Sequence, residues 1–188
     1  LAGQTAPGEK VLASWREGMA YSMELERALM RGQVKVTQGE QSLEADEVEI
    51  RRREEMVTAR GPGRLKGTVA GAEKAGASTA SGPPAPAELS WQTGMTVLGQ
   101  KRVAVFTGAT RLRQGKLSLD AETLTALFDK DRKLEQGIAE GNVTGKDEER
   151  KALARGEKLE WRAAEGTARL WGSQDKPAYV EMNGFGQT

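Results

Sequence analysis

The chain has 188 residues, and its 28 lysine and arginine residues nearly balance 27 aspartate and glutamate residues, for a formal net charge of +1. Because acids and bases interleave throughout the chain, nucleic acid is not expected as a partner. No apolar run approaches the roughly 18 residues that a membrane-spanning helix needs, so none is predicted.

Cysteine and histidine are both absent. This excludes disulfides, thiolate metal sites and every catalytic constellation that needs either residue, so we expect no metal, no cofactor and no enzymatic activity. Acid–base chemistry by paired carboxylates, as in a glycan hydrolase, would require two acids about 5–9.5 Å apart in a cleft. The chain begins at Leu1 without a methionine, which we interpret as a fragment or a processed product.

The first part of the chain predicts strands after a short helix over residues 5–16. Apolar and polar residues alternate over Gly32–Gln38 and again over Leu43–Ala45, and the alternation resumes with shifted parity at Val48–Ile50. A period of two indicates strands with one buried face and one wet face. Gly39 interrupts the pattern where a tight turn needs a positive φ, which glycine adopts readily.

Residues 61–88 differ in composition from the rest of the chain. Glycine, alanine, proline, serine and threonine fill 21 of these 28 positions. Such a segment buries too little apolar surface to offset its ordering entropy, so we predict a flexible insertion in a single domain spanning residues 1–188. A linker between two separately folding halves is the alternative.

The second part of the chain repeats the first. Residues 15–45 align without a gap to residues 91–121, with 10 identities in 31 positions, where average composition would give about two or three. Trp15 aligns with Trp91, and Gly32 and Gly39 align with Gly108 and Gly115. The pattern therefore predicts an all-β fold built from repeated antiparallel meanders.

A weaker third copy begins at Gly141, and a fourth begins near Leu170. Gly32, Gly108 and Gly141 are expected at turns or bulges. Trp15 and Trp91 are expected to be packing anchors at strand starts. The run Arg51–Arg53 could bind lipid phosphates, but a solvated strand end balanced by neighbouring glutamates is favoured.

These motifs resemble the OstA-like family of lipopolysaccharide-transport proteins, the family of LptA, LptC and the N-terminal domain of LptD. The resemblance lies in Gly32–Ile50, Gly108–Leu124 and Gly141–Trp161, each a glycine-led alternating strand followed by a return strand. It implies an elongated, twisted β-jellyroll of two facing antiparallel sheets. It also implies a periplasmic module that binds acyl chains of lipopolysaccharide or another lipid between its sheets and pairs edge strands with similar domains.

The candidate lipid-facing residues are the apolar members of the alternating rows. They are Met19, Tyr21, Leu29, Val34, Val36, Leu43, Val48, Ile50, Met95, Phe106, Leu112, Leu119, Leu124, Ile138, Val143, Leu159 and Trp161. The same residues would fill the core of a structural or adhesive β-repeat scaffold with no lipid ligand, because both roles demand apolar side chains. An interior that is open at one side would favour the lipid carrier.

Overall fold

The computed structural model describes residues 10–69 and 85–182, and every regular element in these ranges is a β-strand. The strands are β1 (Val11–Ser14), β2 (Gly18–Ser22), β3 (Arg27–Gln38), β4 (Gln41–Arg51), β5 (Met56–Val69), β6 (Ala85–Trp91), β7 (Gly94–Leu98), β8 (Val103–Gln114), β9 (Leu117–Phe128), β10 (Leu134–Asp147), β11 (Ala152–Arg162), β12 (Thr167–Trp171) and β13 (Tyr179–Met182).

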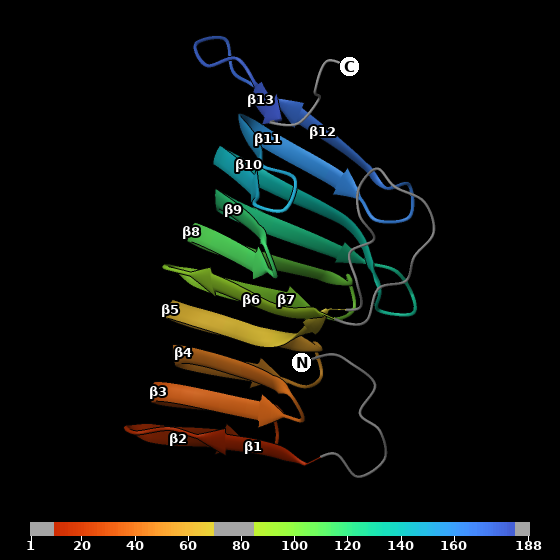
Figure 1. Ribbon diagram of the computed structural model, residues 1–188. Helices are drawn as coiled ribbons and strands as arrows, with labels where there is room; N and C mark the ends of the chain where they lie inside the picture. The colour runs from red at the N-terminus through yellow and green to blue at the C-terminus, as the bar shows by residue number, and fades with distance from the viewer. Residues whose placement is uncertain (1–9, 70–84, 183–188) are drawn as a thin grey trace, which may run out of the picture.

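All of these strands belong to one antiparallel sheet that rises through the molecule from β1 and β2 to β12 and β13 (Figure 1). The long strands β3, β4, β5, β8, β9, β10 and β11 follow one another, with the β6–β7 pair between β5 and β8. The short strands come in the pairs β1–β2, β6–β7 and β12–β13. The two members of each pair lie along successive parts of the same neighbouring strand. Thus β6 and β7 lie along the same edge of β5 and along the same edge of β8.

Glycine bulges bend the long strands at equivalent positions along their length. Gly32, Gly108 and Gly141 have φ near +80°, and each is followed by a second residue with positive φ. The pairing register of β3, β8 and β10 shifts at these points, and Gly61, with φ +76°, occupies the corresponding place in β5. Such bulges turn a strand sharply, so they align into a line along which the sheet is bent.

The bend divides the sheet into two layers. We call the half that contains β2, β7 and β12 the β7 layer, and the half that contains β1, β6 and β13 the β6 layer. Buried apolar residues from both halves form one core cluster, and the rings of Trp91 and Phe106, one from each layer, lie 5.6 Å apart. The predicted β-jellyroll of two facing antiparallel sheets is confirmed, and the two sheets are halves of a single bent sheet.

The internal repeat is also a structural repeat. Met19 pairs with Met30 and Met95 pairs with Phe106, and every described pairing of β1 and β2 with β3 recurs 76 residues later between β6, β7 and β8. Gly39 and Gly115 have φ of 54° and 56° in the β3–β4 and β8–β9 hairpin turns, as predicted. Equivalent sequence therefore forms equivalent backbone pairing.

Some boundaries differ from the sequence prediction. Residues 61–69 and 85–88, expected in a flexible insertion, are strand in β5 and β6, while residues 70–84 lie outside the described residues. The helix expected over residues 5–16 is wrong for Val11–Ser14, which is β1. Prediction from composition fails here because backbone pairing with a neighbouring strand needs no apolar side chains.

Two residues assigned to the inner row lie on the outer face. Leu29 pairs with Glu49, and Ile138 pairs with Glu160, whereas the adjacent Met30 and Ala139 are buried in the core cluster. Each lies before a bulge that shifts the alternation, so counting by twos across the bulge assigned the wrong face.

Arginine side chains cover the outer face of β3, β4 and β5. Glu49 is buried beneath them and pairs with Arg51 and, at 2.7 Å, with Arg27. The hydrogen bond from Arg51 lowers the pKa of Glu49, and the nearby charges of Arg27 and Arg60 act in the same direction. Arg53 lies 3.5 Å from Glu26. Arg51, which also pairs with Glu54, and Arg53 are thus balanced by neighbouring acids, in line with the expected charge-balanced strand end.

Candidate functional site

The candidate site is the apolar interior between the two layers. Side chains next to the bend are fully buried, as at Val34 and Val48. Farther from the bend, several inward apolar side chains are only partly buried: Ile50, Val57, Val97 and Phe128 in the β7 layer, and Leu65, Leu112 and Leu119 in the β6 layer. Burial thus falls at several inward positions away from the bend but not at all of them, because Val36, Leu43, Leu89 and Ala104 lie in the same rows and remain buried.

Large and small residues alternate across the interior. Trp91 pairs with Gly63 in the strand register and is almost fully buried, and a Cβ added at Gly63 would lie 2.5 Å from the Trp91 ring. The indole Nε1 of Trp91 donates a hydrogen bond to the carbonyl oxygen of Gly61 at 3.1 Å. Trp161 pairs with Gly137 and covers it in the same manner. Each glycine gives room for an indole ring to lie across a strand.

The structure brings most of the predicted site residues together. Val34, Val36, Leu43, Val48, Met95, Phe106, Leu124 and Val143 are in the buried cluster, and Ile50, Leu112, Leu119, Leu159 and Trp161 pack against it. Met19 and Tyr21 do not join it. Both lie on β2 at the end of the molecule and are exposed.

Sequence reasoning missed the contribution of β5. Val57, Ala59 and Leu65 line the interior, but their strand lies partly in the glycine- and proline-rich segment that had been assigned to an insertion. Phe128 at the end of β9 was missed as well. The signal that could have found β5 was its own alternation, Val57, Ala59, then Gly63 and Leu65 after the bulge.

The interior near the bend is suited to apolar contact and offers no group for acid–base chemistry. Among the described residues the buried polar side chains are Glu49, which faces outward, and Thr110, whose hydroxyl donates to the carbonyl oxygen of Ala121 at 2.9 Å. No group of three or more acidic side chains that could hold a metal ion is found in the described ranges. The buried cluster of the described residues is therefore almost entirely apolar.

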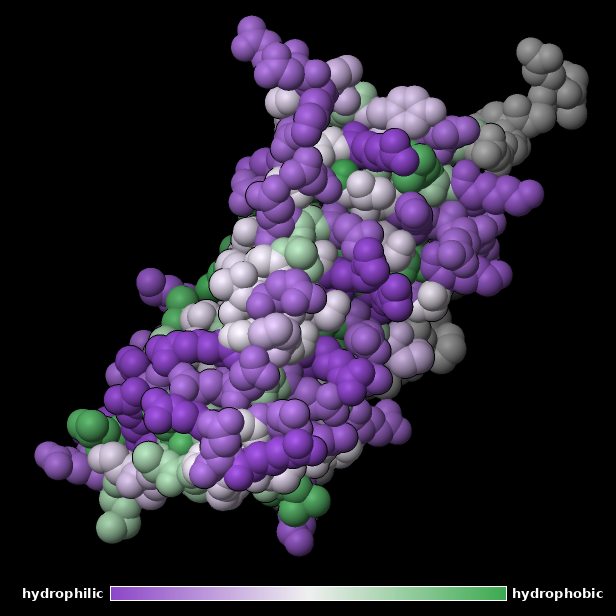
Figure 2. All heavy atoms as spheres, turned by 90° about the vertical axis from the view of Figure 1, so that its left-hand side faces the viewer, coloured by the Kyte–Doolittle hydropathy of each residue, from purple (hydrophilic) through white to green (hydrophobic). Residues whose placement is uncertain are grey.

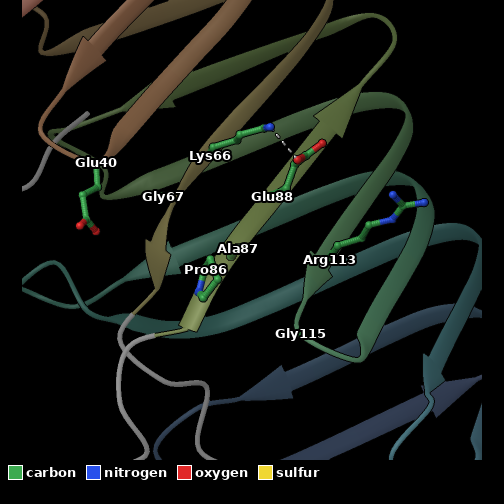
Figure 3. A pocket seen from close by; sticks show the side chains of 8 residues that line it. All are labelled: Glu40, Lys66, Gly67, Pro86, Ala87, Glu88, Arg113 and Gly115. Atoms are coloured by element: carbon green, nitrogen blue, oxygen red, sulfur yellow. Dashed lines mark ion pairs between the residues drawn. The ribbon is translucent and has the colours of Figure 1, made fainter.

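A separate hollow of about 400 Å³ lies near the free ends of β5, β6 and β8 (Figure 3). Its charged side chains include Lys66 and Glu88, which form an ion pair at 3.3 Å, and Arg113. Glu40 and Gly115 come from the two neighbouring hairpin turns. Its charged side chains distinguish it from the apolar core cluster.

Both ends of the molecule expose large apolar side chains. At one end are Val11, Leu12, Trp15, Met19, Tyr21, Met23 and Leu25, and at the other are Trp171, Tyr179, Val180 and Met182. Figure 2 shows a mostly hydrophilic flank, with hydrophobic side chains near the lower end, where β1 and β2 lie, and in separate places higher up. Within the described strands, β1, β2, β12 and β13 each pair along one edge.

The bent sheet, its repeated bulges and its apolar interior define a two-layered β-jellyroll. The family model described as "LptA/(LptD N-terminal domain) LPS transport protein" matches residues 18–87 and 93–176. Because the match spans most of the chain, the protein belongs to this family. In the residues that the structure describes, no helix has the length and apolar character required to cross a membrane.

Among solved structures, the chain is similar to LptH of Pseudomonas aeruginosa, described as the LptA homologous periplasmic component of the conserved lipopolysaccharide transport device. The two are 15% identical, the TM-score is 0.49, and the match covers 66% of this chain and 78% of the other. No curated protein matches the chain in sequence.

Proposed function

We propose that this protein is a periplasmic, non-enzymatic module of lipopolysaccharide transport to the outer membrane, which binds acyl chains between its two layers. The observation that carries the proposal is the partial burial of several inward apolar side chains away from the bend. Apolar side chains of both layers remain partly open there, Ile50 and Phe128 on one side and Leu112 and Leu119 on the other. Acyl chains inserted between them gain about 0.8 kcal/mol per buried CH₂.

The exposed ends support a second part of the proposal, that similar jellyroll domains stack end to end. Strands with unpaired backbone groups offer an edge for strand addition by a neighbour. The apolar side chains of β1 and β2 at one end, and of β12 and β13 at the other, would be buried by such stacking. A row of stacked domains would join their interiors into one apolar path. Membership in the lipopolysaccharide-transport family agrees with this arrangement.

Binding of a fluorescent lipid A analogue tests the ligand. We expect saturable binding to the wild-type chain, and we expect Leu112→Asp to weaken it at least tenfold. The added carboxylate would stand among acyl chains without a partner, and an unpaired charge in an apolar site is strongly unfavourable. Fluorescence titration at a temperature where circular dichroism shows both proteins folded measures the effect.

Leu127→Asp is the matched control, because Leu127 is also partly buried but lies on the outer face of β9, next to the inward Phe128. It should bind the analogue as the wild type does. No saturable binding by the wild-type chain would contradict the lipid carrier and would favour a structural or adhesive scaffold whose interior is filled by its own side chains.

A further inference from the structure

The internal repeat places the same surface in two settings, once covered and once open. The β6–β7 pair is covered by β5 on the edge opposite β8. Its counterpart 76 residues earlier, the β1–β2 pair, has the same pairing with β3 but no strand on its other edge in the described part of the chain. The seam between β5 and the β6–β7 pair is therefore a template for what covers β1 and β2.

The exposure of the equivalent residues differs in line with the strand pairing of the described residues. Trp91 is 1% exposed and Met95 is 4% exposed, whereas their counterparts Trp15 and Met19 are 39% and 47% exposed. The break between β1 and β2 has the same hydrogen bond as the break between β6 and β7. Arg16 N donates to Gly32 O at 2.7 Å, and Gln92 N donates to Gly108 O at 2.6 Å. The same local structure is thus buried where a strand like β5 is present and open where the described ranges contain no such strand.

The covering strand has a specific sequence requirement at the template seam. Gly63 faces Trp91, and a Cβ at Gly63 would lie 2.5 Å from the indole and 2.7 Å from the carbonyl oxygen of Glu44. Two residues earlier, Gly61 forms the bulge, its N–H donates to Thr93 O at 2.9 Å, and its carbonyl accepts from Trp91 Nε1. A strand that covers a tryptophan in this manner therefore carries glycine-x-glycine, with the first glycine at its bulge.

The other described bulges lack the second glycine. Two residues after the bulge glycine, β3 has Val34, β8 has Thr110 and β10 has Val143. A side chain at that position would meet the indole ring. The glycine-x-glycine pattern of β5 therefore distinguishes the strand that lies against the Trp91 ring from β3, β8 and β10, although β8 pairs with the other edge of the β6–β7 pair.

We infer that the edge formed by β1 and β2 receives a bent strand of another jellyroll domain that carries glycine-x-glycine, with its second glycine opposite Trp15. The inference rests on the proposed stacking of jellyroll domains and adds the register and the sequence of the partner strand. From the pairs Gly63 with Trp91 and Leu65 with Leu89, the partner residue two positions after that glycine lies opposite Ala13. Trp15 is the residue that selects the partner.

Disulfide cross-linking tests the register, because the chain has no cysteine of its own. The probe is a synthetic peptide with the sequence of residues 56–69 and cysteine in place of Leu65, added to full-length Ala13→Cys protein under mild oxidation. Directly opposed residues on paired strands lie about 4.5–5.5 Å apart, within disulfide range. We expect efficient cross-linking to Ala13→Cys and at least tenfold less to Leu12→Cys, which faces the other side.

The selectivity is tested with a second peptide that carries Gly63→Val. It should cross-link to Ala13→Cys at least tenfold less than the glycine peptide, and adding Trp15→Ala to the protein should restore its cross-linking. Equal yields for both peptides, equal yields at positions 12 and 13, or cross-linking only between two copies of the protein would overturn the inference.

Lipid A analogue binding, measured on the same preparations, separates this inference from the proposed function. If cross-linking fails while the wild-type chain binds the analogue, the partner-strand inference is wrong and the lipid carrier stands. If the analogue does not bind, the proposed function fails whatever the peptides do.

Discussion

Trp91→Ala is expected to lower the free energy of unfolding by about 3–5 kcal/mol, the range found for large-to-small aromatic substitutions in cores. Trp91 is the largest of the fully buried side chains. Its ring covers Gly63, contacts Phe106 from the opposite layer and donates a hydrogen bond to Gly61. Its removal would open a cavity at the point where the bend, both layers and the seam between the repeats meet. Urea unfolding followed by circular dichroism measures the loss.

Trp15→Ala is the matched control for this prediction, since Trp15 occupies the equivalent place in the repeat with its outer side open. It should change the free energy of unfolding of the isolated chain by less than about 1 kcal/mol, as substitutions away from the core usually do. Equal losses at the two tryptophans would show that the repeats are not packed as described.

Gly108→Ala is expected to destabilise the protein by about 3 kcal/mol. Gly108 has φ +81°, a backbone conformation that costs an L-residue about 1–2 kcal/mol. In addition, its new Cβ would lie 2.7 Å from Thr93 Cβ and 2.8 Å from Thr93 N, and overpacking of this kind typically adds 1–3 kcal/mol. Because the bulge sets the bend of β8, we also expect weaker binding of the lipid A analogue.

Two glycines separate these contributions. Gly115 has φ +56° and no atom within 4 Å of an added Cβ, so Gly115→Ala should lose only the backbone term of about 1–2 kcal/mol. Gly18 has neither a close neighbour nor a positive φ, and Gly18→Ala should be close to neutral. Thermal or urea unfolding of the three variants should give this order, and a neutral Gly108→Ala would refute the role of the bulge.

The sequence predicted the fold class because a period of two survives wherever one face of a strand is buried. Val34 and Val36, and then Leu43 and Ala45, were placed on the inner face correctly for this reason. The internal repeat also predicted that Trp15 and Trp91 occupy equivalent places, and the pairing registers of β1 with β3 and of β6 with β8 confirm it. These are properties of single strands and of pairs at constant offset, and both can be read from residue order.

The bend could not be read in the same way. A bulge inserts residues that belong to neither face, so Leu29 and Ile138 were placed inside although their neighbours Met30 and Ala139 are the buried ones. The strand character of β5 was not apparent because one of its inward positions is Gly63. The space that a side chain would fill there is occupied by the ring of Trp91 from the next strand. The packing of a large side chain from one strand against a glycine of another depends on the tertiary structure, so the composition of a segment does not reveal it.

Photo-cross-linking to lipopolysaccharide at two adjacent residues of β9 tests the central claim, that acyl chains lie between the two layers. A photoreactive phenylalanine analogue at Phe128 faces the interior, and one at Leu127 faces outward on the same strand. The account predicts a lipopolysaccharide adduct at position 128 and none at position 127. Adducts of equal yield at both positions, or an adduct at position 127 alone, would contradict it.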